Sequence, residues 1–210
     1  MLVFAVILGT AGCPGAPKDI LSPVPDPMSL APVNIVACKT SAVVVIDDPV
    51  QRACCACMSP AGSVLVGAIE AAGLPTPTEF ARRVVKVAAE SVGAQLPSWP
   101  LITTIDTAVS DLRSFRGTTV VEVRVNQLMF GAYYGLKSAT TVRILDRTGV
   151  RIWQRSYTYV SKAAGRTLSL EEYRKNSNLP SKRAEAIGAV RSEMEFAAEA
   201  TAHDLVEHLR

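Results

Sequence analysis

The chain of 210 residues has the size of one compact domain of roughly 150 residues plus a targeting segment. Its formal charge of +3, from 22 basic and 19 acidic residues, excludes a charged tail and gives little support for nucleic-acid binding, which needs a clustered basic face. With 49% hydrophobic and 20% charged residues the chain is not largely disordered, and no apolar run reaches the roughly 20 residues that span a bilayer.

The first twelve residues carry no charged side chain, and Cys13 follows them directly. An apolar run this short is typical of the core of a signal peptide. The small residues Thr10, Ala11 and Gly12 before Cys13 resemble the lipobox of bacterial lipoproteins. The resemblance implies a signal peptide over residues 1–12, cleavage before Cys13, and a lipid anchor on its thiol and amine, palmitate included. The alternative is a buried N-terminal strand with an ordinary core cysteine.

Residues 13–33 follow as a proline-rich tether. Six prolines lie in this segment: Pro14, Pro17, Pro23, Pro25, Pro27 and Pro32. Proline fixes φ and removes a hydrogen-bond donor, so the segment is expected to be extended and semi-rigid. Pro14 rather than an aspartate follows the cysteine. In the enterobacterial sorting pattern this favours the outer membrane, with the protein facing the periplasm.

The first part of the remaining chain predicts one strand and three helices. The β-branched run at 42–46 indicates a buried strand that ends in the turn Asp47-Asp48-Pro49. Small residues at 64–72 suggest a helix, or a loop that becomes ordered against a partner. Apolar residues at helical spacing predict a helix from a Thr78 cap to about Leu96, and a further helix at 106–115.

In the second part of the chain, apolar residues recur at every second position. Alternating valines at 121–126 predict a half-buried strand, and a glycine-punctuated loop at 130–136 follows. The turn at 146–149 predicts a hairpin whose strands lie within 140–159. A short helix at 170–175 and a helix at 181–209 complete the chain. Residues 34–210 are therefore expected to form a single α+β domain, with helices packed on one face of an antiparallel sheet.

Four cysteines remain if Cys13 is acylated: Cys38, Cys54, Cys55 and Cys57. An exported protein meets an oxidising compartment, so pairing is expected, and Cys38 joined to one of the cluster is the plausible disulfide. A bond between Cys54 and Cys55 is disfavoured because vicinal bonds are strained. A thiolate site for Cu(I) or Zn(II) is the rival interpretation, although the spacing lacks paired C-x2-C ligands.

The remaining residues that could take part in chemistry do not favour catalysis. Five positions separate His203 from His208, which places them about 140° apart on a helix, so they do not share a ligand face. Asp47 and Asp48 are expected in a polar turn rather than at a cation. We find no G-x-S-x-G, P-loop or H-E-x-x-H motif in the sequence. The sequence therefore predicts a protein that is not an enzyme, without a cofactor or a metal site.

Aromatic residues beside glycine give the candidate partner-binding residues Phe130, Tyr133 and Tyr134. Trp153, among the arginines of the hairpin, is the fourth candidate. The alternative is that these rings cover the end of the sheet.

From Val121 onward the chain resembles small envelope lipoproteins, through TTVVEVRVNQL at 118–128, TTVRILDRTGVRIWQRSYTY at 140–159 and the terminal helix. The hairpin is similar to auxiliary lipoproteins of lipid-trafficking ABC systems, and to lipoproteins of curli secretion channels and penicillin-binding-protein activation. The resemblance implies a scaffold component of a cell-envelope complex that binds an envelope protein or a second copy of itself. Its alternative is a phospholipid-binding auxiliary subunit of an ABC transport system.

Overall fold

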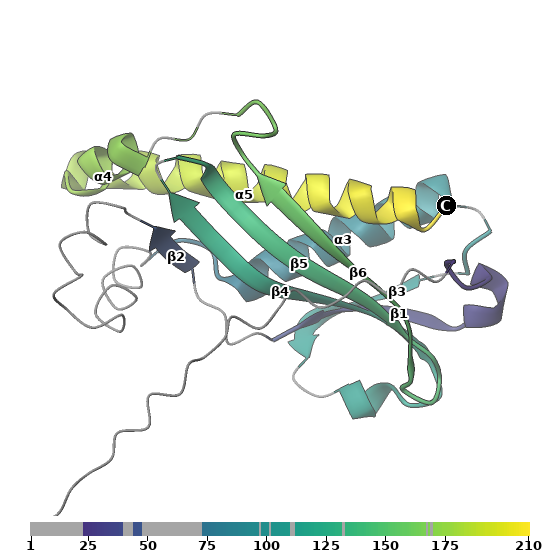
Figure 1. Ribbon diagram of the computed structural model, residues 1–210. Helices are drawn as coiled ribbons and strands as arrows, with labels where there is room; N and C mark the ends of the chain where they lie inside the picture. The colour runs from purple at the N-terminus through teal and green to yellow at the C-terminus, as the bar shows by residue number, and fades with distance from the viewer. Residues whose placement is uncertain are drawn as a thin grey trace, which may run out of the picture.

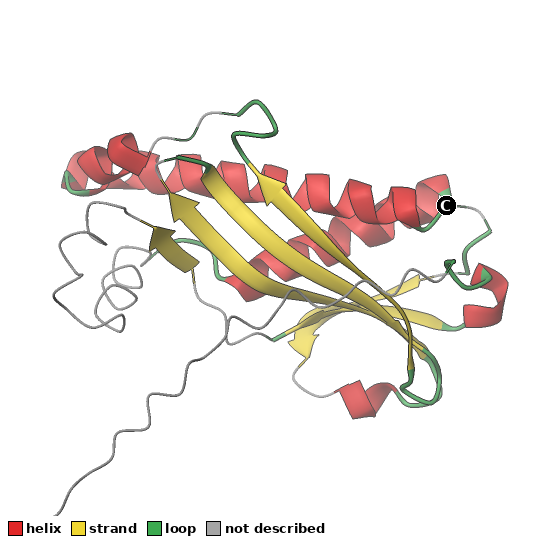
Figure 2. Ribbon diagram, in the orientation of Figure 1, coloured by secondary structure: helices red, strands yellow, loops and turns green. Residues whose placement is uncertain are grey.

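A computed structural model describes residues 23–39, 44–47, 73–96, 98–100, 102–109, 112–131, 133–166, 168 and 170–210. Its strands form one six-stranded sheet, and the two long helices lie side by side on one face of it (Figures 1 and 2). The predicted α+β class with helices on a sheet is confirmed. The predicted signal segment lies outside the described residues.

The sheet is mixed rather than purely antiparallel. Its order is β3-β1-β4-β5-β6, with β2 beside β4; the strands are β1 (Val33–Cys38), β2 (Val44–Asp47), β3 (Ile102–Val109), β4 (Thr119–Gly131), β5 (Gly135–Leu145) and β6 (Arg151–Val160). The strands β4, β5 and β6 are antiparallel neighbours, whereas β1 runs parallel to both β3 and β4, and β2 runs parallel to β4.

The predicted hairpin is confirmed. β5 and β6 pair antiparallel from Lys137↔Val160 to Leu145↔Arg151, and the turn at 146–149 joins them. The Asp146 carboxylate accepts hydrogen bonds from the backbone N–H groups of Thr148 and Val150, each at 2.9 Å. This is the local side-chain pairing for which aspartate is favoured in turns.

The predicted helix at 106–115 is wrong. This segment lies in β3 up to Val109, and Leu112–Phe115 forms the short 3₁₀ helix η2. Isoleucine, threonine and valine dominate 102–109, and these β-branched residues lose side-chain freedom in a helix. The parallel ladder with β1 satisfies the backbone of the segment, and β1 itself has no counterpart in the sequence prediction.

Two helices carry the packing of the helical layer. The helix α3 (Pro77–Gln95) begins at a Thr76 cap, not at Thr78, because Thr76 and Glu79 form a reciprocal capping box. The helix α5 (Pro180–His208) follows the short α4 (Leu170–Ser177), close to the predicted bounds of both. A 3₁₀ turn, η1 (Pro27–Leu30), precedes β1.

The core lies between these helices and the sheet. Val84 and Val85 of α3 and Val123 of β4 are each no more than 1% exposed, and α3 and α5 run in the same direction. At the far end of the two helices the indole N–H of Trp99 donates to the carbonyl of Leu209 at 3.1 Å. This bond ties the chain after α3 to the end of α5.

Candidate functional site

Two of the four predicted partner-binding residues are core residues. Phe130 is fully buried in β4 and makes an edge-to-face contact with Tyr173 at 5.3 Å, and Trp153 is 3% exposed. The prediction that they meet a partner directly is wrong, because the period of two in β4 and β6 turns both rings toward the helices. The predicted loop at 130–136 is a short turn between β4 and β5.

The other two candidates belong to that turn. Tyr133 is 73% exposed, the largest exposed fraction among the large hydrophobic side chains described. Tyr134 is half-buried, and its ring packs over Gly131, where a Cβ atom would lie 2.6 Å from Cζ of the ring. Of the predicted residues, Tyr133 alone therefore presents its ring fully to solvent.

Cys38 is a free, buried cysteine at the end of β1. It is 2% exposed, and burial together with the nearby Glu122 carboxylate raises the pKa of its thiol to about 12. The predicted disulfide from Cys38 is therefore absent from the structure. Cys13, Cys54, Cys55 and Cys57 lie outside the described residues, as does the predicted helix at 64–72.

Within the described ranges, no group of three or more histidine, cysteine, aspartate or glutamate side chains is placed to hold a metal ion. His203 is exposed, while Nδ1 of His208 lies 2.6 Å from the carbonyl oxygen of Asp204. The backbone of Asp47 ends β2, and Asp48 lies outside the described residues. In the same ranges no helix is long and apolar enough to cross a membrane.

A buried carboxylate on the sheet face opposite the helices has no counterpart in the sequence prediction. Glu122 is 1% exposed and accepts from Nε of Arg124 at 2.9 Å, while Arg143 lies 3.6 Å from its second oxygen. Arg143 and Arg151 both donate to Oε1 of Gln154 at 2.9 Å. The alternation at 121–126 reveals which side chains share a face, but not that Glu122 is buried on it.

A second buried carboxylate joins α5 to the end of β6. Glu193 is 4% exposed and accepts from the hydroxyls of Tyr159 at 2.6 Å and Ser161 at 2.8 Å, and from Nε of Arg166 at 2.6 Å. The Arg166 guanidinium also lies 4.0 Å from the centre of the Phe196 ring. The one carboxylate accepts hydrogen bonds from all three side chains, which favours a structural role for this cluster over a reactive one.

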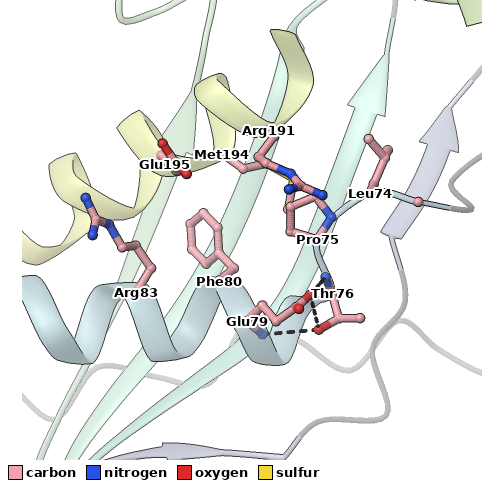
Figure 3. A pocket seen from close by; sticks show the side chains of 10 residues that line it. Leu74, Pro75, Thr76, Glu79, Phe80, Arg83, Arg191, Met194 and Glu195 are labelled. Atoms are coloured by element: carbon pink, nitrogen blue, oxygen red, sulfur yellow. Dashed lines mark hydrogen bonds between the residues drawn. The ribbon is translucent and has the colours of Figure 1, made fainter. Parts of the chain in front are cut away.

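The candidate functional site is a groove on the helical layer, between α3, α5 and the segment 73–76 (Figure 3). Its volume is about 500 Å³. Phe80 and Met194, each 3% exposed, and Leu74, 8% exposed, supply its apolar floor. The remaining lining residues are Gly73, Pro75, Thr76, Glu79, Arg83, Arg191 and Glu195.

The capping box fixes one wall of the groove. The carboxylate of Glu79 accepts from the backbone N–H of Thr76 at 2.6 Å and from its hydroxyl at 3.0 Å (Figure 3). These hydrogen bonds, the backbone one first, lower the pKa of the Glu79 carboxyl. The first turn of α3 is thus held at the mouth of the groove with its carboxylate charged.

Charges of both signs line the rim. Arg83 donates from its terminal nitrogen to Glu199 at 2.6 Å, and both side chains are about two-fifths exposed. The Nε of Arg83 is buried and has no hydrogen-bond acceptor in the described part of the chain. Arg191 and Glu195, one turn apart on α5, stand on the opposite wall (Figure 3). The groove can therefore offer an apolar contact together with charged groups of both signs.

Sequence reasoning missed this groove because its walls come from segments more than a hundred residues apart. The sequence did contain one usable signal, the T-x-x-E pattern at Thr76 and Glu79, which marks where α3 begins. Nothing in the pattern of α5 indicated that Met194 would face Phe80.

No family model and no curated protein matches the chain. Among solved structures it is similar to the PelC dodecamer from Paraburkholderia phytofirmans, at 11% identity and a TM-score of 0.37 over 84% of this chain and 88% of that one. It is also similar to protein XCC0632 from Xanthomonas campestris, of family model DUF330, at 13% identity and a TM-score of 0.41 over 82% and 81% of the two chains. At these scores the likenesses carry no functional argument.

Proposed function

We propose that the protein is a lipid-anchored, non-catalytic component of a bacterial cell-envelope assembly. In this proposal Cys13 holds it at the outer membrane facing the periplasm, and the groove between α3 and α5 binds a segment of a partner protein. The groove is the observation that carries the binding role. Its volume of about 500 Å³ lies within the range of roughly 300–1,000 Å³ that is usual for ligand sites.

The charges of the rim favour a peptide over an anionic ligand. Glu79 and Glu195 balance Arg83 and Arg191, so the rim has no excess of either sign. A peptide segment can place an apolar side chain on the floor and its own charged or polar groups against the carboxylates and guanidiniums of the rim.

The packing of the core argues against the alternative role in phospholipid handling. A lipid carrier needs a deep apolar space for acyl chains, and the natural place would be between the sheet and the helices. Side chains such as Val84 and Val123 fill that layer and are not exposed at all. An acyl chain in the groove between α3 and α5 would meet a charged rim.

The partner proposal is tested by site-specific photo-crosslinking in cells. The photoreactive residue p-benzoylphenylalanine replaces Glu195 on the rim, and adducts are identified by mass spectrometry. A specific protein adduct is expected, and Arg191→Glu should abolish it because the rim then becomes acidic. Arg183→Glu is the matched control, since Arg183 is an exposed arginine about two turns earlier on α5.

Each outcome decides between the two roles. Loss of the adduct in Arg191→Glu but not in Arg183→Glu supports the partner-binding groove. An adduct to phospholipid alone supports the lipid-handling role, and an adduct that both variants retain would contradict a role for the Arg191 charge in binding the partner.

The anchor is tested separately from the groove. Cys13→Ser should abolish labelling of the chain with a palmitate analogue and release it from the outer-membrane fraction. Labelling that persists in this variant would overturn the anchor.

A further inference from the structure

The four charged residues on the rim of the groove between α3 and α5 differ in what they already bind. On α3, Glu79 accepts hydrogen bonds from the backbone and the hydroxyl of Thr76 in the capping box. Arg83, one turn later on α3, donates to the carboxylate of Glu199 at 2.6 Å. Both charges on the α3 wall are therefore bound to groups within the domain.

The two charged residues on the α5 wall are not bound in this way. Arg191 and Glu195 are exposed, and neither forms an ion pair within the described part of the chain. The hydrogen bonds from Thr76 and, to a smaller extent, the positive charge of Arg191 lower the pKa of the Glu79 carboxyl. Arg191 thus acts on Glu79 without pairing with it. The guanidinium of Arg191 and the carboxylate of Glu195 remain available to a group from outside.

The spacing of these two residues gives the α5 wall a defined pattern. Four positions separate Arg191 from Glu195, so their charges lie on one side of α5, about 6 Å apart along its axis. Met194 stands on the same wall and supplies part of the apolar floor (Figure 3). A base four residues before an acid is the less stabilising order in a helix, so the pair does little for α5 itself. The wall offers an apolar contact flanked by a positive and a negative charge.

We propose that the groove binds an amphipathic helix of its partner, in which an acidic and a basic residue four positions apart meet Arg191 and Glu195. An apolar residue on the same face of that helix enters the floor beside Met194. The proposal rests on the proposed partner-binding role of the groove. Two helices that lie side by side leave a groove into which a third helix packs its apolar stripe, and residues four apart on that helix reproduce the 6 Å spacing. A segment with charges of one sign only would be repelled by one of the two residues.

The test reverses the order of the two charges without changing their number. The photoreactive p-benzoylphenylalanine replaces Pro75, which lines the groove, so all four rim charges stay in place. In this background Arg191→Glu with Glu195→Arg should lower the yield of the protein adduct in cells several-fold, because each partner charge then meets a like charge. The matched control is Lys86→Glu with Glu90→Lys. These two residues are exposed, follow the same order four positions apart on α3, and do not line the groove.

The adduct also gives the sequence of the partner segment. Mass spectrometry of the crosslinked peptide is expected to find an acidic and a basic residue four positions apart. Exchanging those two residues in the partner should restore the adduct to the chain that carries Arg191→Glu and Glu195→Arg. The order of the two charges in the segment then gives its direction relative to α5. Thermal unfolding of both reversed chains checks that each is folded.

The outcomes separate this inference from the proposed function. Absence of any protein adduct from the unreversed groove would overturn both. The charge-matched helix alone is overturned by an adduct that the reversed groove retains, by equal losses in the reversed groove and its control, or by a partner exchange that restores nothing. In those three cases the partner-binding groove stands.

Discussion

The carboxylate of Glu193 lies 2.6 Å from Nε of Arg166, although the two residues belong to the middle of α5 and the turn after β6. The Glu193 side chain is 5% exposed and the Arg166 side chain 38% exposed, so the pair joins a buried carboxylate to a partly exposed guanidinium. The same carboxylate accepts the hydroxyls of Tyr159 and Ser161. This cluster therefore fixes where α5 crosses the end of the sheet.

Removal of the Glu193 carboxylate is expected to destabilise the domain. In Glu193→Ala the buried hydroxyls of Tyr159 and Ser161 lose their acceptor, and the free energy of unfolding should fall by about 3 kcal/mol. Urea denaturation measures the change. The control Glu195→Ala removes an exposed carboxylate two residues away and should stay within about 0.5 kcal/mol of wild type. Equal effects of the two variants would contradict a structural role for the cluster.

The burial of Trp153 gives a test of the β5–β6 hairpin. Trp153→Ala leaves a cavity where the ring packs and should lower the free energy of unfolding by about 3–5 kcal/mol. Tyr133→Ala, at the most exposed aromatic position, should change it by less than about 0.5 kcal/mol. Thermal or chemical unfolding of the two variants checks both values. An unchanged midpoint for Trp153→Ala would show that the ring is not in the core.

Replacing each of two glycines by alanine should change the free energy of unfolding in opposite directions. At Gly135 the backbone has φ of +71°, and a Cβ atom would lie 2.9 Å from Cβ of Ser161, so Gly135→Ala should cost about 2 kcal/mol. Gly93 lies in α3 with nothing within 4 Å of a Cβ atom. Gly93→Ala should therefore stabilise the protein by about 0.5–1 kcal/mol. Unfolding midpoints compare the pair, and the same sign for both would refute the backbone argument.

The buried thiol of Cys38 predicts a loss of stability in alkali. Its pKa is raised from 9.0 to about 12 in the folded protein, so above pH 9 the unfolded chain releases a proton that the folded chain keeps. The unfolded state is favoured by that release, and this contribution to stability falls as the pH rises from 9 toward 12. Urea midpoints at pH 8 and pH 10 should separate more in wild type than in Cys38→Ala. Parallel decreases in the two proteins would show that other groups cause the effect.

Local sequence patterns correctly predict the elements that are stabilised by contacts within their own few residues. The β5–β6 hairpin depends on Asp146 and Gly149 within one turn, and α5 depends on a long run of helix-forming residues. The start of α3 is also determined locally, by Thr76 and Glu79, although the predicted cap at Thr78 is two residues too late. These predictions succeed because a turn or a helix closes its hydrogen bonds within a few residues.

Tertiary structure decided the rest. The segment at 102–109 became a strand because β1 was available to pair with it, and that pairing joins residues about seventy positions apart. Tertiary packing also determined that Phe130, Trp153 and Glu122 are buried and Tyr133 is exposed. The groove depends on Phe80 and Met194 meeting across two helices. For the β5–β6 hairpin and the two long helices the sequence alone determined the period and the residues on each face, because these follow from local backbone geometry. Which faces are covered depends on contacts between distant segments, and only the folded chain establishes those.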